Sequence, residues 1–119
     1  MDQTHVVLRY RDGRTERVSL DAIKAEQRVA AVTRDGVKGE VAFSELKAIF
    51  FPRIVSDDEL GTADGSTIAV EFADGEVIRG LAHYNPERNG FFLFPHDRSK
   101  NDRIFVVNSA IVSIEVEKL

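Results

Sequence analysis

Residue types that could do acid–base or metal chemistry are few in this chain and lie far apart. The three histidines, His5, His83 and His96, do not have the spacing of a metal site, which needs three or four convergent ligands. The acidic run 57–59 could hold a hard cation, but it lacks the alternating oxygen ligands and central glycine of a calcium loop. A His-Asp-Ser set exists only within residues 96–99, and neighbouring loop residues rarely reach nucleophile–base geometry. We therefore predict no enzyme activity, no metal site and no cofactor.

Composition excludes further classes. The chain has 119 residues and no cysteine, so it has no disulfide framework, thiolate zinc site or cysteine nucleophile. It also lacks the glycine-rich nucleotide motifs. The net charge is −4, and no segment concentrates the positive charge typical of a non-specific nucleic-acid binder. The N-terminus has no basic region followed by an apolar stretch, and no apolar run could span a bilayer, so we expect a cytoplasmic protein without a membrane partner.

Cationic and amide side chains gather around one polar stretch between residues 88 and 108. Guanidinium groups suit phosphate or carboxylate partners, and loops on a rigid scaffold commonly carry binding groups. Our candidate binding residues are Arg88, Asn89, Arg98, Lys100, Arg103 and Asn108. The alternative is a solvated loop whose positive charges are balanced by Glu87, Asp97 and Asp102.

Phenylalanines are concentrated in two short segments. They are Phe50 and Phe51 in one, and Phe91, Phe92 and Phe94 in the other. Consecutive aromatic residues place rings on both faces of a strand, so something besides the strand's own barrel must cover one face. Burial between the two halves of the chain is the simplest account. Self-association or an unknown protein partner is the alternative, which makes these five residues candidates for an interaction surface.

The elements that must position these residues are strands. Apolar and polar residues alternate at Val6, Leu8 and Tyr10, and again in 111–117, which indicates strands with one face in the core. Asp-Gly pairs between alternating runs indicate hairpins in which both turn residues have positive φ. We expect a polar helical turn at 21–25, and strands near 5–11, 14–20, 28–33, 37–43, 67–73, 76–84, 91–94, 103–107 and 111–117. A further strand is expected to follow a short turn at 44–46 and to end at Pro52.

Two similar halves organise these strands. Residues 9–18 align with 70–79, and residues 41–49 align with 106–114. Internal duplication and the ordinary likeness of two β-meanders both account for this. We predict an all-β antiparallel protein of two related small SH3-like or Sm-like barrels, or half-barrels, packed as one unit. The expected parts are an N-terminal meander at 1–53, an acidic linker at 54–65 and a C-terminal barrel at 66–119.

The C-terminal half resembles the Sm-like family of small barrels. The pair Asp74-Gly75, Gly80 and the segment 84–89 match the spacing of that family's first motif. Residues 104–107 and 111–114, around Asn108-Ser109, take the place of its second motif. The likeness implies RNA or nucleotide-phosphate binding. However, Asn108-Ser109 replaces the basic-Gly pair that RNA-binding members use.

The whole chain resembles an uncharacterised bacterial domain family. The likeness rests on the segment Gly90–Pro95, the segment Arg103–Asn108 and the upstream segment Leu46–Phe51. Members are similar to modules found alone or beside signalling domains, which implies a regulatory or interaction role. We therefore predict a non-catalytic binding module, with protein–protein interaction or a signalling accessory role favoured over RNA binding.

Overall fold

Ten antiparallel strands form one continuous sheet. The computed structural model describes residues 4–52, 65–85, 87–96 and 101–117. The strands are β1 (Thr4–Tyr10), β2 (Thr15–Lys24), β3 (Val29–Arg34), β4 (Val37–Ala42), β5 (Leu46–Pro52), β6 (Ser66–Phe72), β7 (Val77–Ala82), β8 (Gly90–Pro95), β9 (Asn101–Val107) and β10 (Ile111–Val116). Within the described residues, 3-10 turns occur at η1 (Ala25–Gln27), η2 (Phe43–Glu45) and η4 (Asn108–Ala110). The sheet runs in the order β10-β6-β7-β8-β9-β5-β1-β2-β3-β4.

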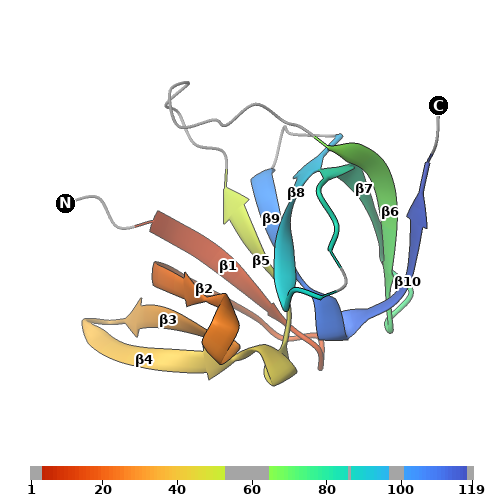
Figure 1. Ribbon diagram of the computed structural model, residues 1–119. Helices are drawn as coiled ribbons and strands as arrows, with labels where there is room; N and C mark the ends of the chain where they lie inside the picture. Colours follow the sequence, from red (N-terminus) through yellow and green to blue (C-terminus); the bar gives the residue numbers. More distant parts are fainter. Residues whose placement is uncertain (1–3, 53–64, 86, 97–100, 118–119) are drawn as a thin grey trace.

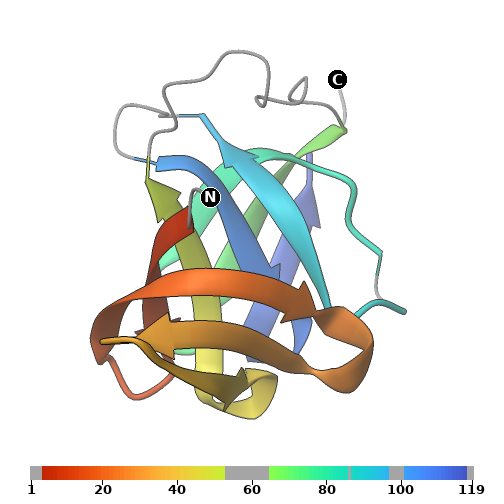
Figure 2. The ribbon, with the colours of Figure 1, turned by 90° about the vertical axis from the view of Figure 1, so that its left-hand side faces the viewer.

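The sheet folds over itself into three layers (Figure 1). Figure 2 shows β2, β3 and β4 crossing in front of a middle layer of β1, β5, β9 and β8, with β6, β7 and β10 behind it. Successive side chains of a strand point to opposite faces. The middle layer can therefore fill two interiors at once, one toward each outer layer.

Burial on the middle strands follows from this layering. Residues 46–51 of β5 are all buried, with no alternation between wet and dry positions. Continuous apolar runs are typical of strands covered on both faces. The phenylalanine-rich segments 50–51 and 91–94 lie in this layer, because β5 pairs with β9 and β9 pairs with β8. Across the junction of the two halves, the Phe51 ring packs edge-on against Phe92, with centroids 5.7 Å apart.

The all-β antiparallel fold is confirmed, and of the two predicted alternatives, barrels or half-barrels, the sheet does not form closed barrels. The two halves have the same strand order, β5-β1-β2-β3-β4 and β10-β6-β7-β8-β9. Closing the first half would require β4 to reach the free side of β5, but β9 occupies that side. The sheet therefore stays open, and β4 and β10 are its two edges. The halves are half-barrels in one sheet, and their origin by duplication stays a prediction.

The local predictions need three corrections. Residues 21–24 continue β2, and the 3-10 turn follows at 25–27. Among the Asp-Gly hairpins, only Asp35-Gly36 has positive φ at both residues, 49° and 80°. At Gly13 and Gly75 the glycine alone is positive, which is typical of a type I turn followed by a glycine bulge. On β10, both Val112 and Val116 are exposed, so the expected core face is incomplete.

A single hydrophobic core joins the two halves. Its fully buried side chains come from both, among them Leu8, Leu46, Ile49, Ile68 and Leu93. The acidic linker predicted at 54–65 lies almost wholly outside the described residues, as does the acidic run 57–59. Within the described part of the chain, no helix is long and apolar enough to cross a membrane.

Candidate binding groove

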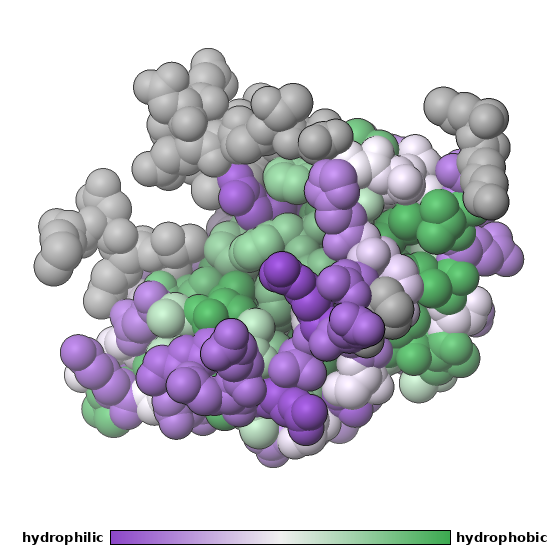
Figure 3. Space-filling model, in the orientation of Figure 1, coloured by the Kyte–Doolittle hydropathy of each residue, from purple (hydrophilic) through white to green (hydrophobic). Residues whose placement is uncertain are grey.

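A groove of about 1040 Å³ lies where the two halves meet. One wall comes from the end of β2 and from η1, through Ile23, Ala25 and Glu26. The other wall comes from residues 83–85 and 87–89, between β7 and β8, and the floor comes from β8 and β9. Figure 3 views this side of the molecule, where apolar surface lies beside hydrophilic side chains.

Aromatic rings form the floor. Phe92 is 39% exposed although its ring packs on two others, with centroids 5.7 Å from Phe51 and 5.2 Å from Phe105. The Arg103 guanidinium lies 6.0 Å from the Phe92 ring centre and 5.6 Å from that of Phe94. A cation over aromatic faces is held by the ring quadrupoles. The floor therefore presents an apolar ring beside a positive charge, both supported from below.

Hydrogen bonds made by asparagine side chains connect the residues of the wall between β7 and β8 to one another and to the opposite wall. The Asn85 carbonyl accepts the Arg88 N–H at 3.1 Å, and the Asn85 side-chain oxygen accepts the Glu87 N–H at 2.9 Å. Asn108 donates its Nδ2 to the carbonyls of Asn85, at 3.1 Å, and of Arg88. Asn89 donates its Nδ2 to the Ala25 carbonyl at 2.7 Å, which connects this wall to the opposite one.

These contacts alter the roles expected for two predicted binding residues. The amide donors of Asn89 and Asn108 are already used by backbone carbonyls, so these side chains position the groove. The Asn108 Oδ1 is buried without a hydrogen-bond partner among the described residues, because both carbonyl contacts are made by its amide nitrogen. Both asparagines therefore support the wall of the groove.

Of the predicted cations, the structure brings Arg88 and Arg103 to the groove. Arg88 is exposed and makes no ion pair with any residue in the described part of the chain. Arg98 and Lys100 lie outside the described residues. Glu26 and Glu87 also line the groove, so its charge is mixed.

The predicted aromatic surface divides in two. Phe50 and Phe51 are buried in the core, whereas Phe92 and Phe94 reach the groove, and Phe91 is buried at its lining. None of the predicted binding residues belongs to the opposite wall, which comes from Ile23, Ala25 and Glu26. That wall meets the floor only because β2 crosses over β8 and β9, and no local pattern in the sequence signals such a crossing (Figure 2).

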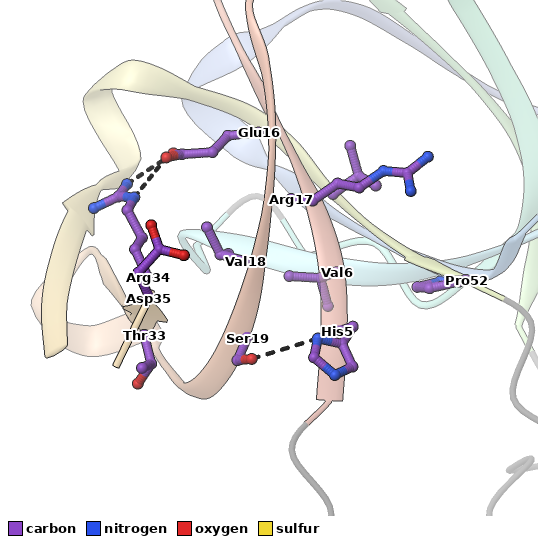
Figure 4. Close-up of a pocket in the computed structure, with 11 residues that line it drawn as sticks. His5, Val6, Glu16, Arg17, Val18, Ser19, Thr33, Arg34, Asp35 and Pro52 are labelled. Carbon is purple, nitrogen blue, oxygen red and sulfur yellow. Dashed lines mark hydrogen bonds and ion pairs between the residues drawn. The ribbon is translucent and has the colours of Figure 1, made fainter. Parts of the chain in front are cut away.

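A second concavity, of about 750 Å³, lies at the β1–β2–β3 corner (Figure 4). Glu16 accepts two hydrogen bonds from Arg34, at 2.6 and 2.9 Å, and one from the Tyr10 hydroxyl at 2.7 Å. The Arg34 hydrogen bonds, followed by that from Tyr10, hold the pKa of Glu16 below its ordinary value. Burial, followed by the bond to Glu16, raises the pKa of Tyr10.

The groups of this corner are satisfied by one another. The Arg34 fork is occupied by Glu16, and the Ser19 hydroxyl lies 3.4 Å from Nδ1 of His5. In Figure 4 Arg17 points away from the Glu16–Arg34 pair, so the charged groups do not converge on one point. The groove over Phe92 is therefore the better candidate for ligand binding.

Comparison with known proteins agrees with the expected family. A family model described as a family of unknown function, DUF6982, matches residues 2–118. The chain belongs to this family. No curated protein and no solved structure matches it. Membership of an uncharacterised domain family is thus confirmed, and the Sm-like likeness stays a prediction.

Proposed function

We propose that this protein is a non-catalytic binding module that holds an extended segment of a protein partner in the groove. One observation carries the proposal: Phe92 remains 39% exposed on a floor of packed rings, with Arg103 beside it. Aromatic residues and arginine are enriched where protein interfaces gain most of their binding energy.

The chemistry of the groove indicates what such a segment carries. An apolar side chain would cover Phe92 and Phe94, removing their exposed faces from water. A carboxylate would pair with Arg88, whose guanidinium offers a fork of donors. A basic or amide group would face Glu26 or Glu87 on the walls. A peptide of mixed charge therefore fits better than a uniformly charged polymer.

Binding of RNA or a nucleotide phosphate is the second candidate. It is favoured by the guanidinium of Arg103 beside the Phe92 and Phe94 rings, since single-stranded bases stack on aromatic faces next to cations. The carboxylates of Glu26 and Glu87 in the same groove oppose a phosphate backbone. The overall charge of −4 acts in the same direction.

Peptide selection tests the proposal. A displayed library of random peptides would be selected on the wild-type protein, and the selected peptides measured on Phe92→Leu, Arg88→Gln and Arg103→Gln. We expect enrichment of sequences with an aromatic or large aliphatic residue near an acidic one. Because truncating an interface anchor typically costs more than about 1 kcal/mol, binding should weaken at least about fivefold in the variants.

The matched control is Val77→Ala, which changes an exposed apolar residue on β7 that does not line the groove. Peptides that bind all variants equally, or a selection without enrichment, would contradict the proposal. A labelled single-stranded RNA oligomer at low salt tests the second candidate. Arg103-dependent and salt-sensitive RNA binding without peptide enrichment would favour that candidate.

The regulatory role, the cytoplasmic location and the bacterial origin stay part of this proposal. The identical strand order of the two halves supports an internal duplication of a small Sm-like or SH3-like unit. A duplicated unit also explains why the groove forms at the junction, since neither half alone supplies both walls.

A further inference from the structure

The last strand of the sheet leaves one side of its backbone open. β10 pairs with β6 and with no other strand of the described chain. The equivalent strand of the first half, β5, pairs on both sides, with β1 and β9. An open edge presents a row of unpaired N–H and C=O groups that can template another strand.

Apolar side chains line this open edge. Val112 is 64% exposed and Val116 is 48% exposed, and Ile111 and Ile114 are only partly buried. Green surface follows the position of β10 at the right of Figure 3. The opposite edge, β4, is protected differently, because it carries the exposed charges Lys38 and Glu40. Edge strands usually carry such charges to prevent association, and between its ends β10 carries only one, Glu115.

We propose that two copies of this protein pair through β10, antiparallel about a two-fold axis at Ile114, to form a dimer with one continuous sheet. The occupant of the edge is thus the same strand of a second molecule. This surface lies on a strand that does not line the groove, so the inference is independent of the proposed function.

Hydrogen-bond direction restricts the register. The Glu117 N–H donates to the Thr67 carbonyl at 2.8 Å, so it points toward β6. Backbone groups of alternate residues point to the same side of an antiparallel strand. The N–H and C=O groups of Ile114 and Val116 therefore point to the open side, whereas at Val112 the register against β6 shifts and the alternation is interrupted. The two copies of β10 can form interstrand hydrogen bonds only in registers that place residues with outward-pointing backbone groups opposite one another.

Side-chain pairing then selects one of the remaining registers. With the axis at Ile114, this residue faces its own copy and exchanges both backbone hydrogen bonds with it. Val112 then faces Val116, and Ser113 faces Glu115. An axis at Glu115 would place two carboxylates directly opposite one another, which is destabilising. An axis at Ser113 would place Glu115 opposite Ile111 and leave Val116 beyond the partner strand.

The size of the contact sets the expected affinity. Pairing of one six-residue strand buries less than a standard interface, which covers roughly 800 Å² on each partner. We therefore expect a reversible monomer–dimer equilibrium with a dissociation constant on the order of 10 µM. The measured mass should rise with concentration from 13.3 kDa toward twice that value.

Sedimentation velocity over a concentration series tests the proposal on the whole chain. The variants are Val116→Lys, which adds an edge charge, and Val116→Pro, which removes an outward N–H without affecting the ladder to β6. The control is Val37→Lys, the same charge at a valine that is 69% exposed on the other edge. Thermal melts establish that each variant is folded.

We expect the wild type and Val37→Lys to dimerise alike, and both Val116 variants to remain monomeric or to weaken at least about tenfold. A wild type that stays monomeric across the series would overturn the proposal. So would dimers that tolerate both Val116 variants, or assembly beyond dimers that Val37→Lys abolishes. The last outcome would mean that β10 pairs with β4 of the next molecule.

Discussion

Lys47 connects the two halves of the chain, and replacing it should measurably lower the stability of the protein. Its side chain is 7% exposed, and its ammonium donates to Asp74 at 2.7 Å and also to Glu76. The same ammonium lies 4.8 Å from the Phe72 ring centre. The lysine belongs to β5 of the first half, whereas its three partners belong to the β6–β7 hairpin of the second. Replacing it with methionine keeps the packing volume and removes the charge.

The size of the stability loss depends on how far water can replace Lys47 at the carboxylates of Asp74 and Glu76. Hydrogen bonds to charged groups contribute about 1.5–3 kcal/mol, and both carboxylates keep contact with solvent, so water can replace part of what is lost. We expect Lys47→Met to lower the free energy of unfolding by about 2 kcal/mol at pH 7. For a domain of this length that lowers Tm by roughly 6–10 °C. The control Lys24→Met breaks the exposed Lys24–Glu40 pair, and its effect should stay below about 0.5 kcal/mol.

The pH dependence separates charge from packing. The Lys47 hydrogen bond, with a smaller contribution from the Glu76 N–H, holds the pKa of Asp74 below its ordinary value of 3.8 in the folded protein. A carboxyl whose folded pKa is lowered stabilises fully above the ordinary value and loses that effect as the pH falls through the folded value. The difference between wild type and Lys47→Met should therefore be constant from pH 5 to 8 and shrink below about pH 4.

Chemical denaturation of both proteins across this pH range measures the effect. A difference below about 0.5 kcal/mol at pH 7 would refute the reasoning, because it would mean that the desolvation of Lys47 cancels its bonds. A difference that persists unchanged at low pH would refute the electrostatic cause and indicate a packing effect.

Two further substitutions test the scaffold of the groove. Gly80→Ala should destabilise the protein by about 3 kcal/mol in denaturant melts, because a Cβ there would overlap the Phe94 backbone carbonyl, whereas Gly39→Ala, with 3.8 Å to its nearest atom, should cost less than about 1 kcal/mol. Asn108→Ala should lose about 1 kcal/mol and speed hydrogen exchange at the Arg88 N–H, and Asn108→Asp should cost more, since a carboxylate only accepts and would face two carbonyls. Equal melts for the glycine pair, or an aspartate milder than alanine, would contradict these accounts.

Local sequence patterns predicted the structure correctly where the feature lay within one strand or one turn. The alternation at Val6, Leu8 and Tyr10 gave a strand with these three side chains buried. The proline at 52 ends β5, and the Asn108-Ser109 break became the turn η4. Such patterns are read from neighbours in the chain, so tertiary contacts seldom override them.

The candidate binding residues take different places in the structure. The cations at 88 and 103 reached one groove, but Asn89 and Asn108 proved to be wall supports. An asparagine in the sequence offers the same N–H donors whether its side chain will contact a ligand or bind a backbone carbonyl of its own chain. The carbonyls that use up these amides belong to residues as far away as Ala25, and only the folded chain brings them within reach.

By itself the sequence determined an all-β antiparallel chain with two similar halves, its hairpins and its phenylalanine-rich strands, because period-2 alternation and turn residues act over a few positions. Tertiary structure decided that β9 takes the free side of β5, and that choice had three consequences. It kept both halves from closing, left β5 covered on both faces with Phe50 and Phe51 buried, and left β10 open. The pairing of strands that are distant in the sequence depends on which strand edges come together in the folded chain. The alternation of apolar and polar residues within a strand is the same whichever strand pairs with it, so it does not specify the neighbour.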